Sequence, residues 1–184
     1  TWPLKDVLEV GEELIPLLQP ACERIEIAGS VRRKRALVGD IELLAISKVQ
    51  TPFLGLNPLS LPPGFLLLDP RVDELIAKGI LDYRLNKKGN RTYGPLNKLL
   101  VHIPSGIPVD LFSTAAENWG MSMVVRTGPQ AFCIAVMTRL KALGLRGHAY
   151  GGIDGPGGEY FPCPTEEEVF RLLGWPYRAP EARF

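Results

Sequence analysis

Apolar residues recur every three or four positions from Leu4 to Leu18, directly after Pro3. This spacing places them on one side of a helix, so we predict an amphipathic helix with one buried face. We expect it to end or kink near Pro16 and Pro20, because proline lacks the N–H that an interior helical residue donates.

A different period, the alternation of apolar and polar residues, follows this helix. It predicts strands over residues 24–28 and 39–47, separated by a break at Gly29-Ser30. Residues 98–103 and 108–113 alternate in the same way and are joined by a short turn, which predicts a β-hairpin.

Residues 51–70 contain five prolines, which excludes a regular helix or a central strand through most of this segment. We therefore predict a long ordered loop or linker. Asp69-Pro70 then supplies a helix cap and a first-turn proline, and Gly79 supplies a stop. A short helix is expected over residues 71–78.

The rest of the chain carries repeated helix-start and helix-stop signals. Two threonines are each followed three residues later by a glutamate, which is the spacing of a capping box. Glycines and a Gly-Pro pair mark the other helix ends. The elements expected here are a helix from Thr114 with Glu117 through about Val125, a helix from Gly128-Pro129 to Gly144, two short strands around a glycine-rich turn at 151–158, and a helix from Thr165 with Glu168 to Gly174.

These elements predict an α+β protein with two lobes. Residues 1–116 form a lobe built on a mixed sheet, and residues 117–184 form a smaller, mainly helical lobe. Composition agrees with a folded globular chain, since the 184 residues are 46% hydrophobic and 22% charged, with 21 Lys and Arg against 20 Asp and Glu. Disorder, collagen and a charged tail are therefore excluded.

The three cysteines lie far apart and outside any C-x-x-C spacing, which predicts neither a disulfide framework nor a zinc site. No apolar run approaches the roughly 20 residues that cross a bilayer, and the first residues do not resemble a secretory signal. We expect an intracellular, cytoplasmic protein that is not secreted and has no membrane partner.

Basic residues are concentrated in one stretch, although the formal net charge is only +1. Residues 84–101 contain five basic residues and no acid. Such a stretch, broken by Gly89 and Tyr93, fits a hairpin that contacts nucleic-acid phosphates. The alternative is a solvated lysine-rich loop. The candidate DNA-binding residues are Arg84, Lys87, Lys88 and Arg91.

Three acidic residues form a candidate metal site. Asp40 and Glu42 stand two apart on a predicted strand, so their carboxylates leave the same face with Cα atoms about 7 Å apart. Asp110 lies on the later strand at 108–113, which can pair beside the first. Three hard oxygen ligands suit Mg²⁺ or Mn²⁺ together with substrate phosphates. The alternative is an acidic pair that is simply solvated.

The segment before these acids offers phosphate-binding groups. Gly29-Ser30 ends a strand directly ahead of Val31-Arg32-Arg33, so backbone amides, a hydroxyl and guanidinium groups meet at a predicted helix N-terminus. These groups are suited to a triphosphate. Because the Asp-x-Glu pair follows ten residues after the serine, both sites are expected within one nucleotide's length.

The sequences AGSVRR at 28–33 and GDIE at 39–42 resemble the signature of the nucleotidyltransferase superfamily, and more closely that of the family X DNA polymerases of the polymerase β type. The likeness extends to VDL at 109–111, to RTG at 126–128 and to the ending at 168–183. It implies a polymerase β-like palm followed by a small nucleotide-selecting subdomain.

The resemblance also implies roles for individual residues. Asp40 and Glu42 would bridge two divalent ions, Mg²⁺ or Mn²⁺, and Asp110 would bind the catalytic one and help to deprotonate the primer 3′-hydroxyl. The implied substrates are a dNTP and a primer–template or gapped DNA, and we expect a monomer. The implied nucleotide-binding residues are Gly29, Ser30, Arg33, Gly39, Arg126, Thr127 and Gly128.

The predicted function is therefore a DNA polymerase that adds dNMP to a primer 3′-OH, with template-directed synthesis across short gaps in DNA repair or replication. One alternative is a template-independent nucleotidyltransferase acting on DNA or RNA ends. A second is a catalytically silent DNA-binding module, against which the intact acidic trio argues.

Several positions depart from the family pattern. Glu42 stands where a second aspartate is usual, and Val125-Arg126 replaces an aromatic pair. Phe112 stands where the family often has the arginine of Asp-x-Arg, and Ala149 stands at the position of that arginine's partner glutamate. With no lyase domain before the first helix, we expect a minimal viral-type member without abasic-site lyase activity.

Overall fold

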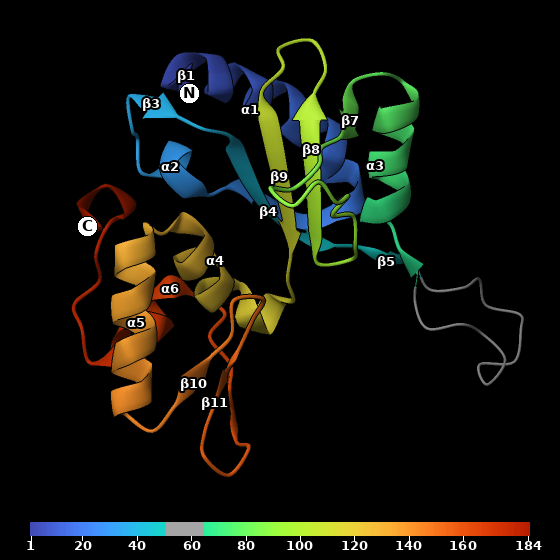
Figure 1. Cartoon of the computed structure of the whole chain (residues 1–184). Helices are drawn as coiled ribbons and strands as arrows, with labels where there is room; N and C mark the ends of the chain where they lie inside the picture. The colour runs from blue at the N-terminus through green and yellow to red at the C-terminus, as the bar shows by residue number, and fades with distance from the viewer. Residues whose placement is uncertain (51–64) are drawn as a thin grey trace, which may run out of the picture.

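The computed structural model describes residues 1–50 and 65–184. Most of the predicted proline-rich loop lies outside the described residues. Two lobes follow one another along the chain (Figure 1). The helices are α1 (Leu4–Leu18), α2 (Gly29–Arg32), α3 (Leu68–Ala77), α4 (Trp119–Thr127), α5 (Gln130–Ala142) and α6 (Glu166–Leu173), with 3-10 turns η1 (Gln19–Ala21), η3 (Ala116–Asn118) and η4 (Pro180–Ala182). The strands are β1 (Trp2–Pro3), β2 (Cys22–Ile27), β3 (Leu37–Val38), β4 (Ile41–Ser47), β5 (Val49–Gln50), β6 (Phe65–Leu66), β7 (Leu81–Tyr83), β8 (Asn97–His102), β9 (Pro108–Ser113), β10 (Arg146–Gly147), β11 (Ile153–Asp154) and β12 (Tyr160–Phe161).

A five-stranded mixed sheet forms the N-terminal lobe, in the order β2-β4-β9-β8-β7. Strands β4 and β9 run parallel, whereas the other neighbours pair antiparallel. The β8–β9 hairpin is present as predicted. In the β4–β9 pair, Glu42 lies directly opposite Asp110. The α+β architecture with a mixed sheet is confirmed.

The two faces of this sheet are covered by different elements. Ile41 belongs to the main core, to which α1 and α3 contribute. Leu44 packs instead with Trp119 of α4. Because successive side chains of a strand point to opposite faces, Glu42 shares the face of Leu44. The acidic trio therefore lies on the side of the sheet that meets the C-terminal lobe.

The C-terminal lobe contains α4, α5, α6 and a small sheet of β10, β11 and β12, and Figure 1 shows these elements gathered apart from the five-stranded sheet. The predicted capping box of Thr165 and Glu168 is present, and Gly174 ends α6 in the left-handed conformation. None of the helices in the described ranges combines the length and the apolar character needed to cross a membrane. The lobe's buried core includes Met121, Phe132, Leu140, Ile153 and Phe170.

Helix α1 ends at Leu18, between the two prolines that were expected to limit it. Pro16 lies inside its last turn and leaves the carbonyl of Glu12 without a helical donor. Both residues are exposed, so water can satisfy that carbonyl.

The predicted start of α3 is wrong. The helix begins at Leu68, and Asp69 is not its cap. The Asp69 carboxylate instead accepts a hydrogen bond from Lys98 Nζ at 2.6 Å. Ser47 Oγ, at the end of β4, accepts from the Leu68 amide at 3.1 Å and so satisfies one of the free N–H groups of the first turn.

The predicted capping box of Thr114 and Glu117 is also wrong. The chain first makes the 3-10 turn η3, and α4 begins at Trp119. The Thr114 hydroxyl is hydrogen-bonded to that of Ser122 at 2.8 Å. Burial of Trp119 against the sheet places the helix start here, and this packing outweighs the local capping preference.

Candidate active site

The acidic trio comes together at the junction of β4 and β9. Glu42 and Asp110 are register partners on these parallel strands, and Asp40 immediately precedes β4. Burial, together with the negative charges of Asp40 and Asp110, raises the pKa of Glu42 to about 7. Burial also raises the pKa of Asp40 and of Asp110. The three carboxylates therefore share one partly buried site, as the strand pattern predicted.

This donor set fits a hard divalent cation, because crowded and partly buried carboxylates are stabilised by positive charge. As the side chains stand, no three acidic, histidine or cysteine residues within 1–50 and 65–184 are close enough to hold a metal ion. One of the three carboxylates is already engaged, since Asp110 Oδ1 accepts a hydrogen bond from Arg84 Nη2. The three acids suit a divalent cation by their residue type and because they converge, and Arg84 is bonded to one of them, Asp110.

Gly29 lies against Glu42 at the start of α2. Its φ is +64°, and a Cβ at this position would lie only 2.6 Å from Glu42 Oε2. Any other residue would be strained and would collide with the carboxylate. Among the described residues, none has an atom within 4 Å of a Cβ placed on Gly39, so no steric reason for glycine is found there. Helix α2, which begins where the helix N-terminus was predicted, is a single four-residue turn.

A hollow of about 370 Å³ opens beside Glu42, between α2 and the turn that follows α4. The Arg33 side chain reaches across it, and its Nη1 donates to the Thr127 carbonyl. Its buried Nε has no hydrogen-bond partner in the described part of the chain. The predicted residues that line this hollow are Ser30, Arg33, Arg126, Thr127 and Gly128, and Val125, Pro129, Gln130 and Cys133 complete it together with Glu42.

Gln130 and Cys133 were not predicted as site residues. They stand three apart at the start of α5, so they share one face of the helix that Gly128-Pro129 opens. This three-residue spacing is the sequence feature from which the two residues could have been identified. Cys133 Sγ donates to the Val125 carbonyl at 3.3 Å, and burial raises the pKa of this thiol.

Arg126 is held between aromatic rings at the edge of the hollow. Its Cζ lies 3.7 Å from the ring centroid of Phe112 and 4.7 Å from that of Tyr150. Its positive charge opposes the rise in the pKa of Glu42. Arg126 and Phe112, two positions that depart from the family pattern, are therefore in contact with each other.

Comparisons with known proteins show similarity to DNA polymerases. Residues 122–184 match the family described as DNA polymerase beta thumb. The chain is 25% identical over 172 residues to DNA polymerase lambda of Rattus norvegicus, which covers 84% of this chain and 28% of that protein. It is 25% identical over 178 residues to the Repair DNA polymerase X of African swine fever virus (strain Badajoz 1971 Vero-adapted), which covers 95% of this chain and 88% of that protein.

The thumb-family match and the likeness to these two polymerases support the resemblance of the chain to a small viral-type family X DNA polymerase. It spans little more than a quarter of the length of polymerase lambda and most of the length of the viral enzyme.

A buried ion network joins the two lobes. Arg32 donates to both carboxylate oxygens of Glu166, at 3.0 and 2.6 Å, and also to Thr127 Oγ1 at 2.8 Å. Arg183 Nη1 forms an ion pair with the same glutamate at 2.9 Å. This network could not be predicted from local sequence, because the motif that contains Arg32 lies more than a hundred residues from α6.

The predicted DNA-binding stretch divides into two groups. Lys87 and Lys88 are exposed, and Arg91 is exposed with its guanidinium 3.7 Å from the ring centroid of Tyr83. Arg84 does not join them, because its side chain is bound to Asp110. The structure therefore brings Arg84 to the acidic trio and leaves the other three at the surface.

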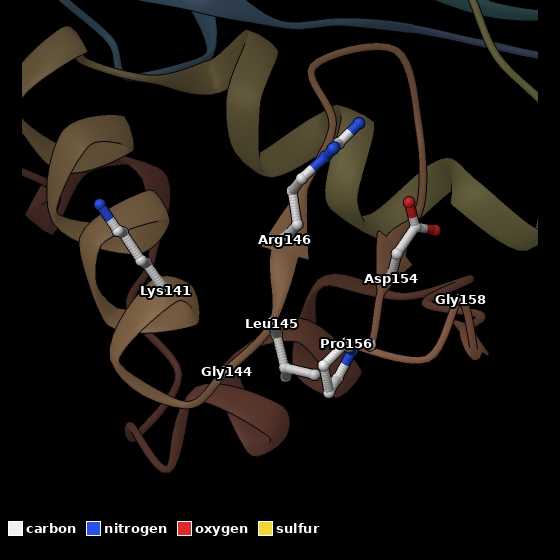
Figure 2. A pocket seen from close by; sticks show the side chains of 8 residues that line it. Lys141, Gly144, Leu145, Arg146, Asp154, Pro156 and Gly158 are labelled. Atoms are coloured by element: carbon white, nitrogen blue, oxygen red, sulfur yellow. The ribbon is translucent and has the colours of Figure 1, made fainter.

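A larger hollow of about 530 Å³ lies elsewhere, between the end of α5 and the β10–β12 sheet (Figure 2). Its charged lining residues are Lys141, Arg146 and Asp154, and the last of these is hydrogen-bonded to His148. None of the predicted site residues lines it. Ser30, Arg33 and Thr127 line the smaller hollow beside Glu42 instead.

Proposed function

We propose that this chain is a DNA polymerase that adds dNMP from a dNTP to a primer 3′-OH, in template-directed synthesis across short gaps. Residues 1–116 would form the palm and residues 117–184 the nucleotide-selecting lobe. The observation that carries the proposal is the pairing of Glu42 with Asp110 beside a hollow lined by Ser30 and Arg33. The names of both relatives, which are DNA polymerases, support the same activity.

In the proposed reaction the primer 3′-oxygen attacks the α-phosphorus, the bond from that phosphorus to the bridging oxygen breaks, and pyrophosphate leaves. Asp40, Glu42 and Asp110 would hold two divalent ions, which when bound stabilise the charge on the attacking and leaving oxygens. Asp110 accepts the 3′-hydroxyl proton at its carboxylate. The carboxylates thus serve both charge balance and proton transfer.

Nucleotide binding is assigned to the hollow beside Glu42. The Ser30 hydroxyl and the Arg33 guanidinium would bind the β- and γ-phosphates. The free Nε of Arg33 supports this role, because a buried donor without a partner is stabilised by an anionic acceptor. Thr127 and Gly128 form the opposite wall, and Gly128 permits close approach, since a Cβ there would lie 3.2 Å from Arg33 Nη1.

Primer extension tests the proposal. The parent and Asp110→Asn are compared on a one-nucleotide gap, on a primer–template and on the primer strand alone, with each dNTP supplied separately. We expect the parent to add the complementary nucleotide and Asp110→Asn to lose extension while dNTP binding largely survives, because Asp40 and Glu42 remain. Asp82→Asn is the matched control, since Asp82 is an exposed carboxylate on the outer strand β7.

Two results would contradict this assignment. Extension by Asp110→Asn within tenfold of the parent would show that β9 does not carry a catalytic carboxylate. Equal extension with and without template would replace the proposed activity with template-independent nucleotidyl transfer.

A further inference from the structure

Arg84 is separated from its basic neighbours by the direction of its side chain. It follows the edge strand β7, and its Nε donates to the Leu100 carbonyl of β8 at 3.2 Å. Its Nη2 donates to Asp110 Oδ1 on β9. The side chain is 31% exposed and that of Asp110 is 15% exposed. Arg84 therefore crosses one strand to reach a carboxylate of the acidic trio.

The charge of Arg84 acts on one side of the trio. Burial raises the pKa of Asp40 and Asp110, and Arg84 opposes this rise at both residues. At Glu42 the opposing charges are those of Arg126 and Arg33. Arg126 also opposes the rise in the pKa of Asp110, but among the described residues Arg84 alone forms a direct ion pair with one of the three carboxylates.

We propose that Arg84 is a positioning residue that holds Asp110 in the absence of a divalent cation and exchanges with that cation for the same carboxylate oxygen. This inference rests on the proposed function. The Arg84 guanidinium places its positive charge on Asp110 Oδ1, so it repels a cation that approaches the same oxygen and competes with it for the carboxylate's charge.

Manganese binding tests the exchange without any reaction. Mn²⁺ is titrated into the protein, free of DNA and dNTP, and unbound ion is followed by electron paramagnetic resonance. We expect Arg84→Gln to bind Mn²⁺ about tenfold more tightly than the parent, because a charge-assisted hydrogen bond no longer competes. The control Lys87→Gln removes a charge from the same stretch without contacting a carboxylate, and its affinity should match the parent.

Thermal unfolding provides a second measurement that also reports folding. In EDTA, Arg84→Gln should melt below the parent, because Asp40 and Asp110 lose their positive neighbour. Saturating Mn²⁺ should then raise its melting temperature more than it raises that of the parent. Arg84→Lys, which keeps the charge but cannot bond Leu100 and Asp110 together, should fall between the two.

The results separate this inference from the proposed function. If Asp110→Asn weakens Mn²⁺ binding but Arg84→Gln leaves it unchanged or weaker, the exchange is wrong and the metal site stands. If neither change alters Mn²⁺ binding, the metal site itself is wrong. DNA affinity measured in EDTA gives a further check, since a fall of about 0.9 in the salt slope for Arg84→Gln would place Arg84 on a DNA phosphate instead.

Discussion

Replacing Glu166 by glutamine removes the one negative charge that Arg32 and Arg183 share. The side chain of Arg183 is fully buried, and those of Glu166 and Arg32 are 8% and 22% exposed. Removing one partner of a buried ion pair costs about 3–5 kcal/mol, because the remaining charge is left uncompensated. Since glutamine still accepts one hydrogen bond and Arg32 is partly solvated, we expect the lower end, about 3 kcal/mol.

The predicted loss can be measured by urea and thermal unfolding. For a chain of this size, 1 kcal/mol shifts the melting temperature by about 2–4 °C, so Glu166→Gln should melt about 6–12 °C below the parent. Glu167→Gln is the matched control, because Glu167 is exposed on the same helical turn. Adding Arg183→Met to Glu166→Gln should restore part of the stability, since it removes a buried charge that has lost its partner.

The same variant should affect the nucleotide site. Arg32 also donates to Thr127 Oγ1, and Thr127 lines the hollow beside Glu42. Loosening Arg32 should therefore weaken dNTP binding severalfold at temperatures well below unfolding. Unfolding within 1 kcal/mol of the parent, with an unchanged dependence on urea, would refute the argument that this network joins the lobes.

Three further outcomes are expected. Replacing Lys87 and Lys88 together by glutamine should weaken binding to duplex DNA of every sequence alike. It should also reduce the slope of log affinity against log salt concentration by nearly two units, because each phosphate contact contributes about 0.9. An unchanged slope would identify a solvated loop. The parent should incorporate ribonucleotides measurably in single-turnover insertion on a one-nucleotide gap. Arg126→Ala should weaken dNTP or DNA binding more than it lowers the maximal rate, because it loses the ring contact with Phe112. Strict deoxyribose selection by the parent together with unaltered affinity in Arg126→Ala would contradict this prediction. Burial raises the pKa of Cys133, so maleimide should label this thiol more slowly at neutral pH than an ordinary thiol. Labelling should accelerate as the pH rises through the raised pKa, and dNTP should block it. A labelling rate that dNTP does not change would show that Cys133 is not part of the nucleotide site.

The parts of the site that could be predicted are those encoded by local periodicity. Alternation places Asp40 and Glu42 on one face at the start of β4, and the same period on β9 places Asp110 on the matching face. The turn at Gly29 was predictable for a related reason, since a glycine that breaks a strand marks an unusual backbone conformation. These features need only neighbours in sequence and one strand pairing.

The parts that could not be predicted depend on which strand a charged residue ends up beside. Arg84 and Lys87 belong to one basic stretch, and nothing in composition separates them. Pairing of β7 with β8 puts Tyr83 opposite Leu100, so the next residue, Arg84, can donate to the Leu100 carbonyl and reach Asp110 one strand away. Lys87 lies three residues further along the chain and is exposed. The sheet order that brings the carboxylates together thus also determines which arginine pairs with one of them. A substitution at Arg84 should therefore change metal binding more than it changes DNA binding.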